Sequence, residues 1–544
     1  MSRPLPLRDC LVSLPVYQVA GPTDRPVTGI ADNSRQVEPG CIFVAVRGYR
    51  TDGHAYIPQA LARGAAVVVV DLRFIEGAAE MRRQYLGEDA PGEAATFLAV
   101  PNSRAALAPL AAAWYGFPAR HLVVIGVTGT KGKTTTTTLI SHVLERGGHR
   151  TGLMSTVDVK VGLHQWPNTL RQSTLEAPQI QSLLREMVAA HCTHAVLEAS
   201  SHGLSTGWNR VGHCGFDVAV ATNVTHEHLD YHGSLEQYRR DKARLFALLG
   251  EELPAPAPSS FPPPLPPTVP APKWAIVNGD DPHHQMFLDA APHTAHRLTY
   301  ALNAAADVRG KVLDSSLAGS RVRVATPWGE SLLTLRLPGR FNVQNGLAAL
   351  SVALSQGMDL EQATTALGEV RGIRGRMEPI DQGQPFGVLV DYAHNPDSFT
   401  QVMGMLRPLT SGRMIAVFGS AGERDREKRP QQGIVAAQFC DLLVLTDEDP
   451  RGEEREAILA DIAAGAEQAG KRPGTGYLVI PDRAAAIRAA FEQARPGDLV
   501  LLLGKGHEGN MVYADGPRPW NEAAEACAAL RAMGYGDDDH DTRQ

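Results

Sequence analysis

Short apolar runs recur along the chain, and polar or glycine-rich turns separate them. The part up to about residue 104 contains CIFVAV (41–46) and AAVVVV (65–70), which predict the strands of a small α/β domain. A second part opens with LVVIGV (122–127), a run typical of a buried strand, and a glycine-threonine loop and a helical stretch follow it. Further strand candidates in this part occupy residues 194–200, 217–224 and 274–280.

A third part begins near the glycine of LPGRFN (337–342) and repeats the alternation of apolar runs and turns. Its strand candidates occupy residues 387–392, 414–419, 441–446 and 498–504. Strands that alternate with helical segments predict mostly parallel, doubly wound sheets, with ligands at the turns after the strands. We therefore expect an α/β protein of three domains, with boundaries at 1–105, 106–336 and 337–544.

Length and composition narrow the class of protein. A chain of 544 residues is too long for one hydrophobic core, and its formal net charge of −7 argues against broad nucleic-acid binding. The six cysteines show no CxxC spacing, so we expect reduced thiols rather than disulfides or a zinc site. No signal peptide and no apolar run of about 20 residues is found, which predicts a cytoplasmic protein without a membrane span.

Residues 252–272 are rich in proline and of low complexity. We interpret them as an exposed polyproline insertion in the central domain rather than a domain linker. A docking site for a proline-binding partner is the alternative. The tail GDDDHDTRQ is expected to be disordered.

A phosphate-binding loop is predicted by GVTGTKGKTTTTT (126–138), which lies between a strand and a helix. Gly129 and Gly132 let the backbone turn its N–H groups towards phosphates, Lys133 supplies a cation, and the Thr134 hydroxyl can coordinate Mg²⁺. The strict GxxxxGK[ST] pattern needs glycine where Val127 stands, so the loop is a variant, and a glycine-rich turn without a ligand is the alternative. The nucleotide contacts are assigned to residues Gly129, Thr130, Lys131, Gly132, Lys133, Thr134 and Thr135.

Polar residues follow two later strands of the central part. Glu198 ends the strand candidate in LEASSHGL and can bind Mg²⁺ directly or through water, and Ser200 can reach an anionic oxygen. His228 follows the next strand, and Lys242 lies on a predicted helix. Taken singly, a histidine at a strand end is more often a structural residue than a ligand.

Several ordered motifs resemble those of the Mur ligases, and of the MurE type in particular. The central matches are GTKGKTTT, EASSHGL, NVTHEHLDYHG and the spacing to Lys242; the others are DNSRQVEPGCIFVAVRGYRTDGHAYI, GRFNVQNGLAAL, RGRMEPI, DYAHNPDS, FGSAGERDREKRP, DEDPRGE and GKGHE. The resemblance covers nearly the whole chain. It implies a uridine-binding N-terminal domain, a central P-loop ATPase domain with a parallel sheet, and a Rossmann-like C-terminal domain that binds an amino acid.

The resemblance also implies a reaction. Mur ligases use ATP to convert a substrate carboxylate into an acyl phosphate, which an amine then attacks. Lys133 and Thr134 would hold the phosphates, and Lys242 would match the family lysine that carries a CO₂-derived carbamate (N6-carboxylysine). The implied Mg²⁺ ligands are Thr134, Glu198 and His228, and the implied catalytic residues are Lys133, Lys242, His228 and Glu198.

Other residues match family substrate contacts. The UDP-muramoyl substrate is assigned to Ser34 and Arg35 for uracil and ribose, and to Ser173, Thr174, Ser200 and Arg210 for the muramoyl peptide. Arg210 lies two residues further on than in the family pattern. The remaining nucleotide contacts are assigned to Asn342 and Asn345 for adenine, and to His394 and Lys428 for the nucleotide or the acyl phosphate; a structural role is the alternative for these four.

The implied amino-acid pocket differs from the DNPR sequence of enzymes that add meso-diaminopimelate. It comprises Arg424, Glu448, Asp449, Arg451, Gly504 and Glu508. Arg451 is retained and can pair with a distal carboxylate, but Asp449 adds a negative charge that disfavours one. We therefore expect L-lysine or L-ornithine as the third amino acid, with meso-diaminopimelate as the alternative.

Two other classes of function remain. One is a different amide ligase, such as folylpolyglutamate synthase or another Mur step, which the N-terminal block and the LDYHG and DPR motifs disfavour. The other is a nucleotide-gated scaffold protein, supported by the proline-rich segment alone and opposed by the retained Glu198, His228 and Lys242. The expected partners are small-molecule substrates only, with no nucleic acid and no membrane, and the expected state is a monomer.

Overall fold

The computed structural model describes residues 4–48, 51–88, 94–170, 172–225, 229–255 and 271–536. Its contacts divide the chain into two compact units, one formed by Met1–Arg309, Thr326–Trp328 and Leu347–Ala363 and the other by Gly310–Ala325, Gly329–Gly346 and Thr364–Gln544. The predicted histidine ligand His228, most of the proline-rich segment and the C-terminal tail lie outside the described residues. In the described ranges, no helix is both long and apolar enough to cross a membrane.

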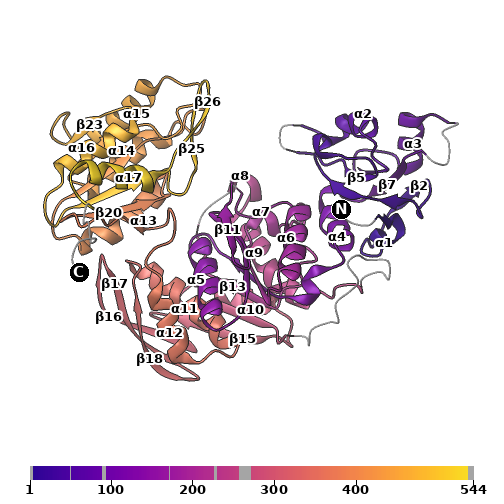
Figure 1. Cartoon of the computed structure of the whole chain (residues 1–544), viewed down its shortest axis with the longest axis horizontal. Coiled ribbons are helices and arrows are strands. Elements are labelled where there is room, and N and C mark those ends of the chain that lie inside the picture. Colours follow the sequence, from indigo (N-terminus) through magenta and orange to yellow (C-terminus); the bar gives the residue numbers. More distant parts are fainter. Residues whose placement is uncertain are drawn as a thin grey trace, which may run out of the picture. The chain divides into compact units, whose positions relative to one another are not determined.

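The N-terminal part of the first unit is a small sheet with the strand order β2-β7-β6-β5-β4 (Figure 1). Its elements are β1 (Leu5–Pro6), α1 (Leu7–Leu11), β2 (Gln18–Ala20), β3 (Pro26–Val27), β4 (Gly29–Ala31), β5 (Cys41–Val44), α2 (Ile57–Ala62), β6 (Val67–Asp71), α3 (Ala78–Leu86), β7 (Thr96–Val100) and α4 (Ser103–Trp114). The apolar runs predicted as strands form β5 and β6, which are buried along their whole lengths. Strands buried on both faces read as continuous apolar runs, which is why the prediction is confirmed here.

The central part of the first unit contains the sheet that carries the phosphate loop. Its elements are β8 (Val123–Thr128), α5 (Lys133–Arg146), β9 (Thr151–Met154), β10 (Asp158–Val161), β11 (His164–Pro167), α6 (Ala177–Ala189), β12 (His194–Glu198), α7 (Ser201–Leu204), β13 (Val218–Ala221), α8 (Leu229–His232), α9 (Leu235–Ala247), β14 (Trp274–Asn278), α10 (His284–Ala290) and β15 (His296–Ala301). The strand order is β11-β10-β9-β12-β8-β13-β14-β15, and β8 is parallel to both of its neighbours. The carboxyl ends of β12, β8 and β13 therefore meet at one edge of the sheet.

The second unit is built around a six-stranded sheet with the order β19-β20-β24-β21-β22-β23. Its elements, with those through which the chain enters it, are β16 (Val308–Ser316), β17 (Gly319–Thr326), β18 (Gly329–Leu335), α11 (Arg340–Ser355), α12 (Leu360–Glu369), β19 (Glu378–Pro379), β20 (Gly387–Asp391), α13 (Pro396–Leu406), β21 (Met414–Phe418), α14 (Lys428–Phe439), β22 (Leu442–Leu445), α15 (Arg455–Gln468), β23 (Tyr477–Val479), α16 (Arg483–Gln493), β24 (Leu499–Leu503), β25 (Asn510–Tyr513), β26 (Gly516–Pro519) and α17 (Glu522–Ala532).

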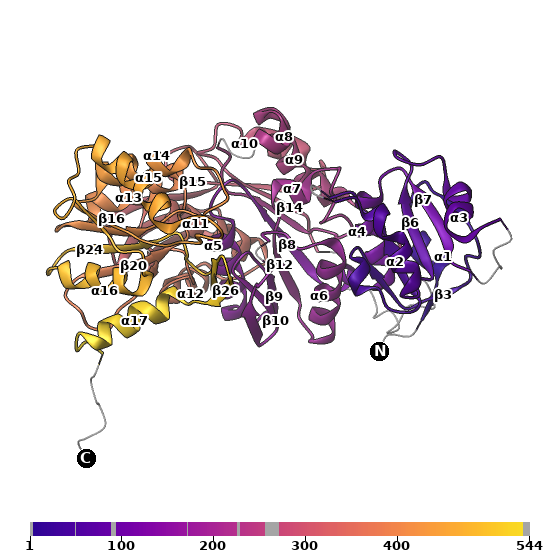
Figure 2. The ribbon, with the colours of Figure 1, turned by 90° about the horizontal axis from the view of Figure 1, so that it is seen from above.

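Helices cover both faces of this sheet, as the doubly wound pattern predicts. One hydrophobic cluster joins the sheet to α13, α14 and α15, and a second joins its other face to α16 and α17 (Figure 2). The short antiparallel strands β10, β11, β25 and β26 were not predicted. They are only four residues long and carry partly or fully exposed positions, so they lack a continuous apolar run.

Candidate active site

The phosphate loop joins β8 to α5, as predicted, and its backbone is held in an unusual conformation. Gly129 and Gly132 have positive φ angles of 148° and 85°. A Cβ atom added at Gly129 would lie 1.9 Å from Oγ1 of Thr222, which follows the neighbouring strand β13. The loop therefore needs glycine at position 129 for its conformation and for space.

Replacement of Gly129 by alanine is expected to destabilise the fold by about 2–3 kcal/mol, because backbone strain and a steric overlap act together. Gly148 is the matched control, since its φ is 86° and nothing lies within 4 Å of an added Cβ. Its replacement by alanine is expected to cost about 1 kcal/mol from strain alone. Urea unfolding of both variants measures the difference, and equal losses would show that Thr222 does not restrict the loop.

The loop after β13 anchors the phosphate loop. Asn223 accepts a hydrogen bond from the Thr130 N–H at its carbonyl (2.7 Å), and from the Lys131 N–H at its side-chain Oδ1 (3.1 Å). The Thr222 hydroxyl donates to the Lys131 carbonyl at 2.6 Å. Sequence reasoning assigned no role to these two residues, although their place after a strand beside β8 is the signal that identifies them.

Two lysines converge on the phosphate loop. Lys133 donates from Nζ to the carbonyls of Gly129 (3.0 Å) and Thr130 (2.9 Å). Lys242 on α9 is buried and donates from Nζ to the same Gly129 carbonyl at 2.6 Å, with its ammonium 4.5 Å from the centroid of the Tyr238 ring. The predicted residues Lys133 and Lys242 therefore share one hydrogen-bond acceptor although they are distant in sequence.

Glu198 ends β12, in register with Val127 of β8, so that its carboxylate lies at the same sheet edge as the loop. The carboxylate is buried and accepts hydrogen bonds from the Thr156 N–H (2.7 Å) and hydroxyl (2.9 Å). Thr156, which sequence reasoning missed, also shares a hydrogen bond with the Ser173 hydroxyl, with the two oxygens 3.0 Å apart. Carboxylate oxygens suit Mg²⁺, so Glu198 could contribute to a site for this ion. The described residues contain no group of three or more His, Cys, Asp and Glu side chains placed to hold a metal.

The predicted muramoyl contacts lie beside Glu198. Thr174 Oγ1 donates to the Glu198 carbonyl (3.0 Å) and accepts a hydrogen bond from the Ser200 N–H (2.9 Å). The guanidinium of Arg210 donates to the Thr174 carbonyl at 2.8 Å and contacts the Glu176 carboxylate at 2.5 Å. The structure therefore brings Arg210 to this group of residues even though its position in the sequence departs from the family pattern.

A cavity of about 320 Å³ lies between the N-terminal and central sheets of the first unit. Its lining residues are Arg47, Gly48, Arg73, Phe74, Arg104, Gly207, Trp208 and Tyr231. The guanidinium carbon of Arg104 lies 3.9 Å from the centroid of the Trp208 ring, and that of Arg47 lies 4.6 Å from the centroid of Phe74. Three arginines with aromatic neighbours suit an anionic ligand that has a planar group. Sequence reasoning did not identify this cavity.

The predicted uridine contacts Ser34 and Arg35 do not line the cavity. Ser34 is buried and donates from Oγ to the side-chain oxygen of Gln59 at 2.7 Å, whereas Arg35 is exposed. Asp32, just before them, is more closely linked to the cavity. Burial raises the pKa of its carboxyl, and the nearby Arg104 and Arg210 oppose that effect.

In the second unit, five of the six predicted amino-acid residues lie on two loops after β22 and β24, and Arg424 lies between β21 and α14. Asp449 is buried and forms an ion pair from Oδ1 to Lys505 Nζ at 2.7 Å, and Oδ1 also accepts from the Val512 N–H at 2.9 Å. Lys505, fully buried, also contacts Glu508 Oε2 at 2.6 Å. The charge of Asp449 is therefore compensated by a lysine that sequence reasoning left out.

The two other predicted residues on the loop after β22, Arg451 and Glu448, differ from Asp449. Arg451 forms no ion pair with any described residue, and its buried Nε lacks a hydrogen-bond partner among them. Burial raises the pKa of Glu448 to about 7, although Lys428 and Lys505 act to lower it. Gly504 has a φ of 101°, and a Cβ there would lie 2.9 Å from Glu448 Oε2. A cation and a carboxylate are thus both available to a ligand.

The other predicted residues of the second unit form two pairs. Asn345 on α11 donates from Nδ2 to Asn342 Oδ1 at 3.2 Å, and both side chains are buried. Lys428 donates from Nζ to the His394 carbonyl at 3.2 Å, and burial lowers the pKa of His394. Arg424 precedes α14, and its neighbour Glu423 has a positive φ of 54°. Positive φ at a non-glycine residue is a form of strain that often marks functional loops.

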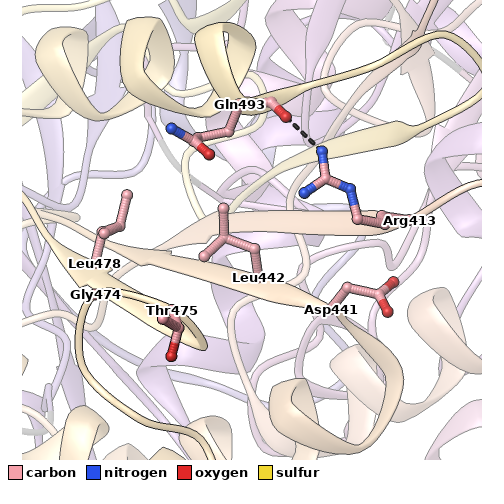
Figure 3. A pocket seen from close by; sticks show the side chains of 7 residues that line it. All are labelled: Arg413, Asp441, Leu442, Gly474, Thr475, Leu478 and Gln493. Atoms are coloured by element: carbon pink, nitrogen blue, oxygen red, sulfur yellow. Dashed lines mark hydrogen bonds between the residues drawn. The ribbon is translucent and has the colours of Figure 1, made fainter.

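A second cavity, of about 230 Å³, lies at the opposite end of this sheet (Figure 3). Arg413 and Asp441, which precede β21 and β22, line it with Leu442, Thr475 and Gln493. Arg413 donates to the Gln493 carbonyl and pairs with Asp498, and Asp441 accepts from the Met414 N–H. Arg413 and Asp441 are therefore each paired with a residue outside the cavity lining, Asp498 and Arg407 respectively, and we expect the active site at the carboxyl ends of the strands.

Comparison with known proteins agrees with this geometry. Three family models match the chain: "Mur ligase family, catalytic domain" at residues 26–115, "Mur ligase middle domain" at 127–258 and 265–353, and "Mur ligase, glutamate ligase domain" at 375–506. A UDP-N-acetylmuramyl-tripeptide synthetase of Roseiflexus sp. is 57% identical over 95% of this chain and 96% of its own. A UDP-N-acetylmuramoyl-L-alanyl-D-glutamate–2,6-diaminopimelate ligase of Syntrophomonas wolfei is 37% identical over 96% and 99%.

Among solved structures, a 2,6-diaminopimelate ligase of the same description is 30% identical and covers 98% of this chain and 100% of its own, with a TM-score of 0.62. The likeness extends over all three domains, and the relatives named here cover 95–98% of the chain. The expected α/β architecture of three domains is confirmed. The chain belongs to the Mur ligase family, as an ATP-dependent, amide-forming ligase of the MurE type that adds the third residue of the peptidoglycan peptide.

Proposed function

We propose that this ligase adds meso-2,6-diaminopimelate to UDP-N-acetylmuramoyl-L-Ala-D-Glu. The observation that carries the proposal is the contrast between Arg451, which has no ion-pair partner among the described residues, and Asp449, which is paired with Lys505. Diaminopimelate has a second carboxylate that lysine and ornithine lack. An unpaired guanidinium favours that carboxylate through charge-assisted hydrogen bonds.

The expected preference for L-lysine or L-ornithine rests on the charge of Asp449. It assumed that Asp449 adds an uncompensated negative charge to the pocket. Lys505 lies 2.7 Å from Asp449 and offsets part of that charge, since it also bonds to Glu508, so the repulsion of a distal carboxylate is weaker than an unpaired Asp449 would cause. Relatives from Syntrophomonas wolfei and Bacillus velezensis that are named as 2,6-diaminopimelate ligases, each 37% identical, support the same choice.

The remaining charges of the pocket fit a diamino acid with two carboxylates. Glu448 has a buried carboxylate whose Oε2 lacks a hydrogen-bond partner among the described residues. An ammonium group of the substrate would supply that partner and favour the ionised form of Glu448. Arg451 would then bind the carboxylate and Glu448 the ammonium of one zwitterionic group. This gives selectivity over a group that carries an amine alone.

The phosphate loop would hold ATP while the substrate carboxylate is phosphorylated. Lys133 and the loop N–H groups would bind the phosphates, with Asn342, Asn345, His394 and Lys428 proposed as the other nucleotide contacts. We propose Thr134, Glu198 and His228 as the ligands of Mg²⁺, although His228 lies outside the described residues. Bound Mg²⁺ would supply charge neutralisation around the transferred phosphoryl group.

Lys242 is proposed to be carboxylated on Nζ. Its burial and its hydrogen bond to the Gly129 carbonyl at 2.6 Å support a role at the phosphates. A carbamate needs a neutral amine, and a buried lysine loses its charge more readily than an exposed one. The modified side chain would be anionic, keep one N–H for Gly129, and hold the site's cations in place.

The UDP-muramoyl substrate would extend across the first unit. Ser173, Thr174, Ser200 and Arg210 are proposed to bind the muramoyl peptide beside Glu198. The arginine-lined cavity suits the nucleotide diphosphate, because Arg47, Arg73 and Arg104 present positive charge and Phe74 and Trp208 present aromatic faces. Ser34 and Arg35, in the N-terminal domain, remain proposed contacts of the uracil and the ribose.

Phosphate release measured with meso-diaminopimelate, L-lysine and L-ornithine in parallel tests the choice of amino acid. Selective turnover with diaminopimelate is expected. The Arg451→Lys variant is expected to lose about 30-fold in kcat/KM for diaminopimelate, equivalent to about 2 kcal/mol. The reason is that lysine lacks the planar guanidinium, whose N–H groups can bond both oxygens of a carboxylate.

Arg518→Met is the matched control, since Arg518 is an exposed arginine on β26 that pairs with Asp515 rather than with a substrate. It is expected to keep the wild-type kcat/KM. Selective turnover of lysine or ornithine by the wild type, or an Arg451→Lys variant that retains full diaminopimelate activity, would contradict the assignment.

A further inference from the structure

A fully buried arginine connects the two loops of the amino-acid site. Arg483 is the first residue of α16, and its guanidinium donates from Nη1 to the Asp447 carbonyl at 2.9 Å and from Nη2 to the Leu503 carbonyl at 2.7 Å. Asp447 immediately precedes Glu448, and Leu503 immediately precedes Gly504. One side chain is therefore bonded to the start of both loops.

No backbone hydrogen-bond ladder joins these two loops among the described residues. β22 and β24 are separated in the sheet by β21, so the ends of the two strands do not pair with each other. A guanidinium can bond two such acceptors at once because its donors form a rigid planar fork, whereas an ammonium on a flexible stem has no fixed span.

The charge of Arg483 is balanced inside the protein. Its Nε donates to both carboxylate oxygens of Glu522, at 3.0 and 2.9 Å, and Trp520 Nε1 donates to Glu522 Oε2 at 2.6 Å. Both charged side chains are fully buried. Buried ion pairs of this kind contribute little net stability compared with apolar residues, so their contribution is better sought in the geometry they impose.

We propose that Arg483 is a positioning residue of the ligase, which holds the loop of Glu448–Arg451 and the loop of Gly504–Glu508 at the separation that the incoming amino acid requires. The inference rests on the proposed function, since it takes these loops to be the amino-acid site. Glu448 and Arg451 are on one loop and Glu508 is on the other. A change of about 1 Å in their separation is enough to lower the reaction rate about 100-fold.

The test compares Arg483→Lys with Arg413→Lys. Arg413 is a matched control because it also pairs with a buried carboxylate, Asp498, and bonds to a backbone carbonyl, but at the opposite end of the same sheet. For Arg483→Lys, the KM for the amino acid is expected to rise about tenfold or more, with the KM values for ATP and the UDP substrate within about twofold of the wild type. Arg413→Lys is expected to change none of the three KM values, while both variants lower the melting temperature similarly.

A second variant, Arg483→Met combined with Glu522→Met, covers the case in which Arg483→Lys does not fold. It leaves no buried charge unpaired but removes both carbonyl bonds, so the same selective rise in KM is expected. An unchanged KM for the amino acid, or an equal change in all three KM values, overturns the proposal. The measurements use whichever amino acid the wild type turns over. Turnover of lysine instead of diaminopimelate would thus refute the proposed function without deciding the role of Arg483.

Discussion

Replacement of Lys133 by methionine is expected to lower kcat about 10³-fold. Lys133 is held 3.0 and 2.9 Å from two carbonyls of the phosphate loop, so its cation lies where we propose that the phosphates bind. Methionine keeps most of the side-chain volume and removes only the charge and the donors. Phosphate release at saturating ATP measures the loss, and the melting temperature should change little.

Lys273→Met serves as the control for this variant. Lys273 also bonds to a backbone carbonyl, that of Phe216 at 2.8 Å, and pairs with Asp217 at 2.9 Å. It precedes β14 and therefore lies at the amino ends of the strands, away from the phosphate loop. Wild-type kcat is expected for Lys273→Met. If both variants lose activity to a similar extent, the loss is a general effect of removing a lysine from this sheet.

Replacement of Lys505 by methionine is expected to destabilise the protein by about 3–5 kcal/mol. Lys505 is fully buried and is bonded to Asp449 at 2.7 Å and to Glu508 at 2.6 Å. Its removal leaves two carboxylates close together without a cation, and one of them is deeply buried. Urea unfolding measures the free energy lost, and the amino-acid KM is expected to rise as well because both loops carry these carboxylates.

A second substitution tests whether the unpaired charge of Asp449 causes this loss of stability. Lys505→Met combined with Asp449→Asn removes one of the two charges, while the asparagine oxygen can still accept from the Val512 N–H. The double variant is expected to regain part of the lost stability. If it is no more stable than Lys505→Met alone, the charge of Asp449 is not the source of the loss.

The sequence predicted the sheets well because the strands are buried on both faces. Continuous apolar runs identified β8, β12, β13 and β14, and the parallel order placed their ends at one edge. The antiparallel strands β10, β11, β25 and β26 were missed, since they are short and partly exposed. Edge strands of this kind carry no apolar pattern that distinguishes them from loops.

The sequence predicted the parts of the candidate site that a local motif marks. It missed the parts that depend on packing between distant segments. The position of Glu198 followed from a strand end, but the hydrogen bonds from Thr156 join segments 42 residues apart and leave no local pattern. Lys505 is a second example of a contact that leaves no local pattern in the sequence. The expectation of lysine or ornithine rested on the charge of Asp449 alone, because the sequence does not say which cation lies beside it.

The hydrogen bond from Lys242 to Gly129 joins residues 113 positions apart, and the Thr222–Lys131 bond spans 91. The nucleotide site therefore assembles only when β13 and α9 have docked beside β8. Contacts so distant along the chain form late, since the loop they close must first lose its freedom. During refolding, ATP binding should thus appear with the last cooperative step, and a nascent chain that ends before α9 has no working phosphate loop.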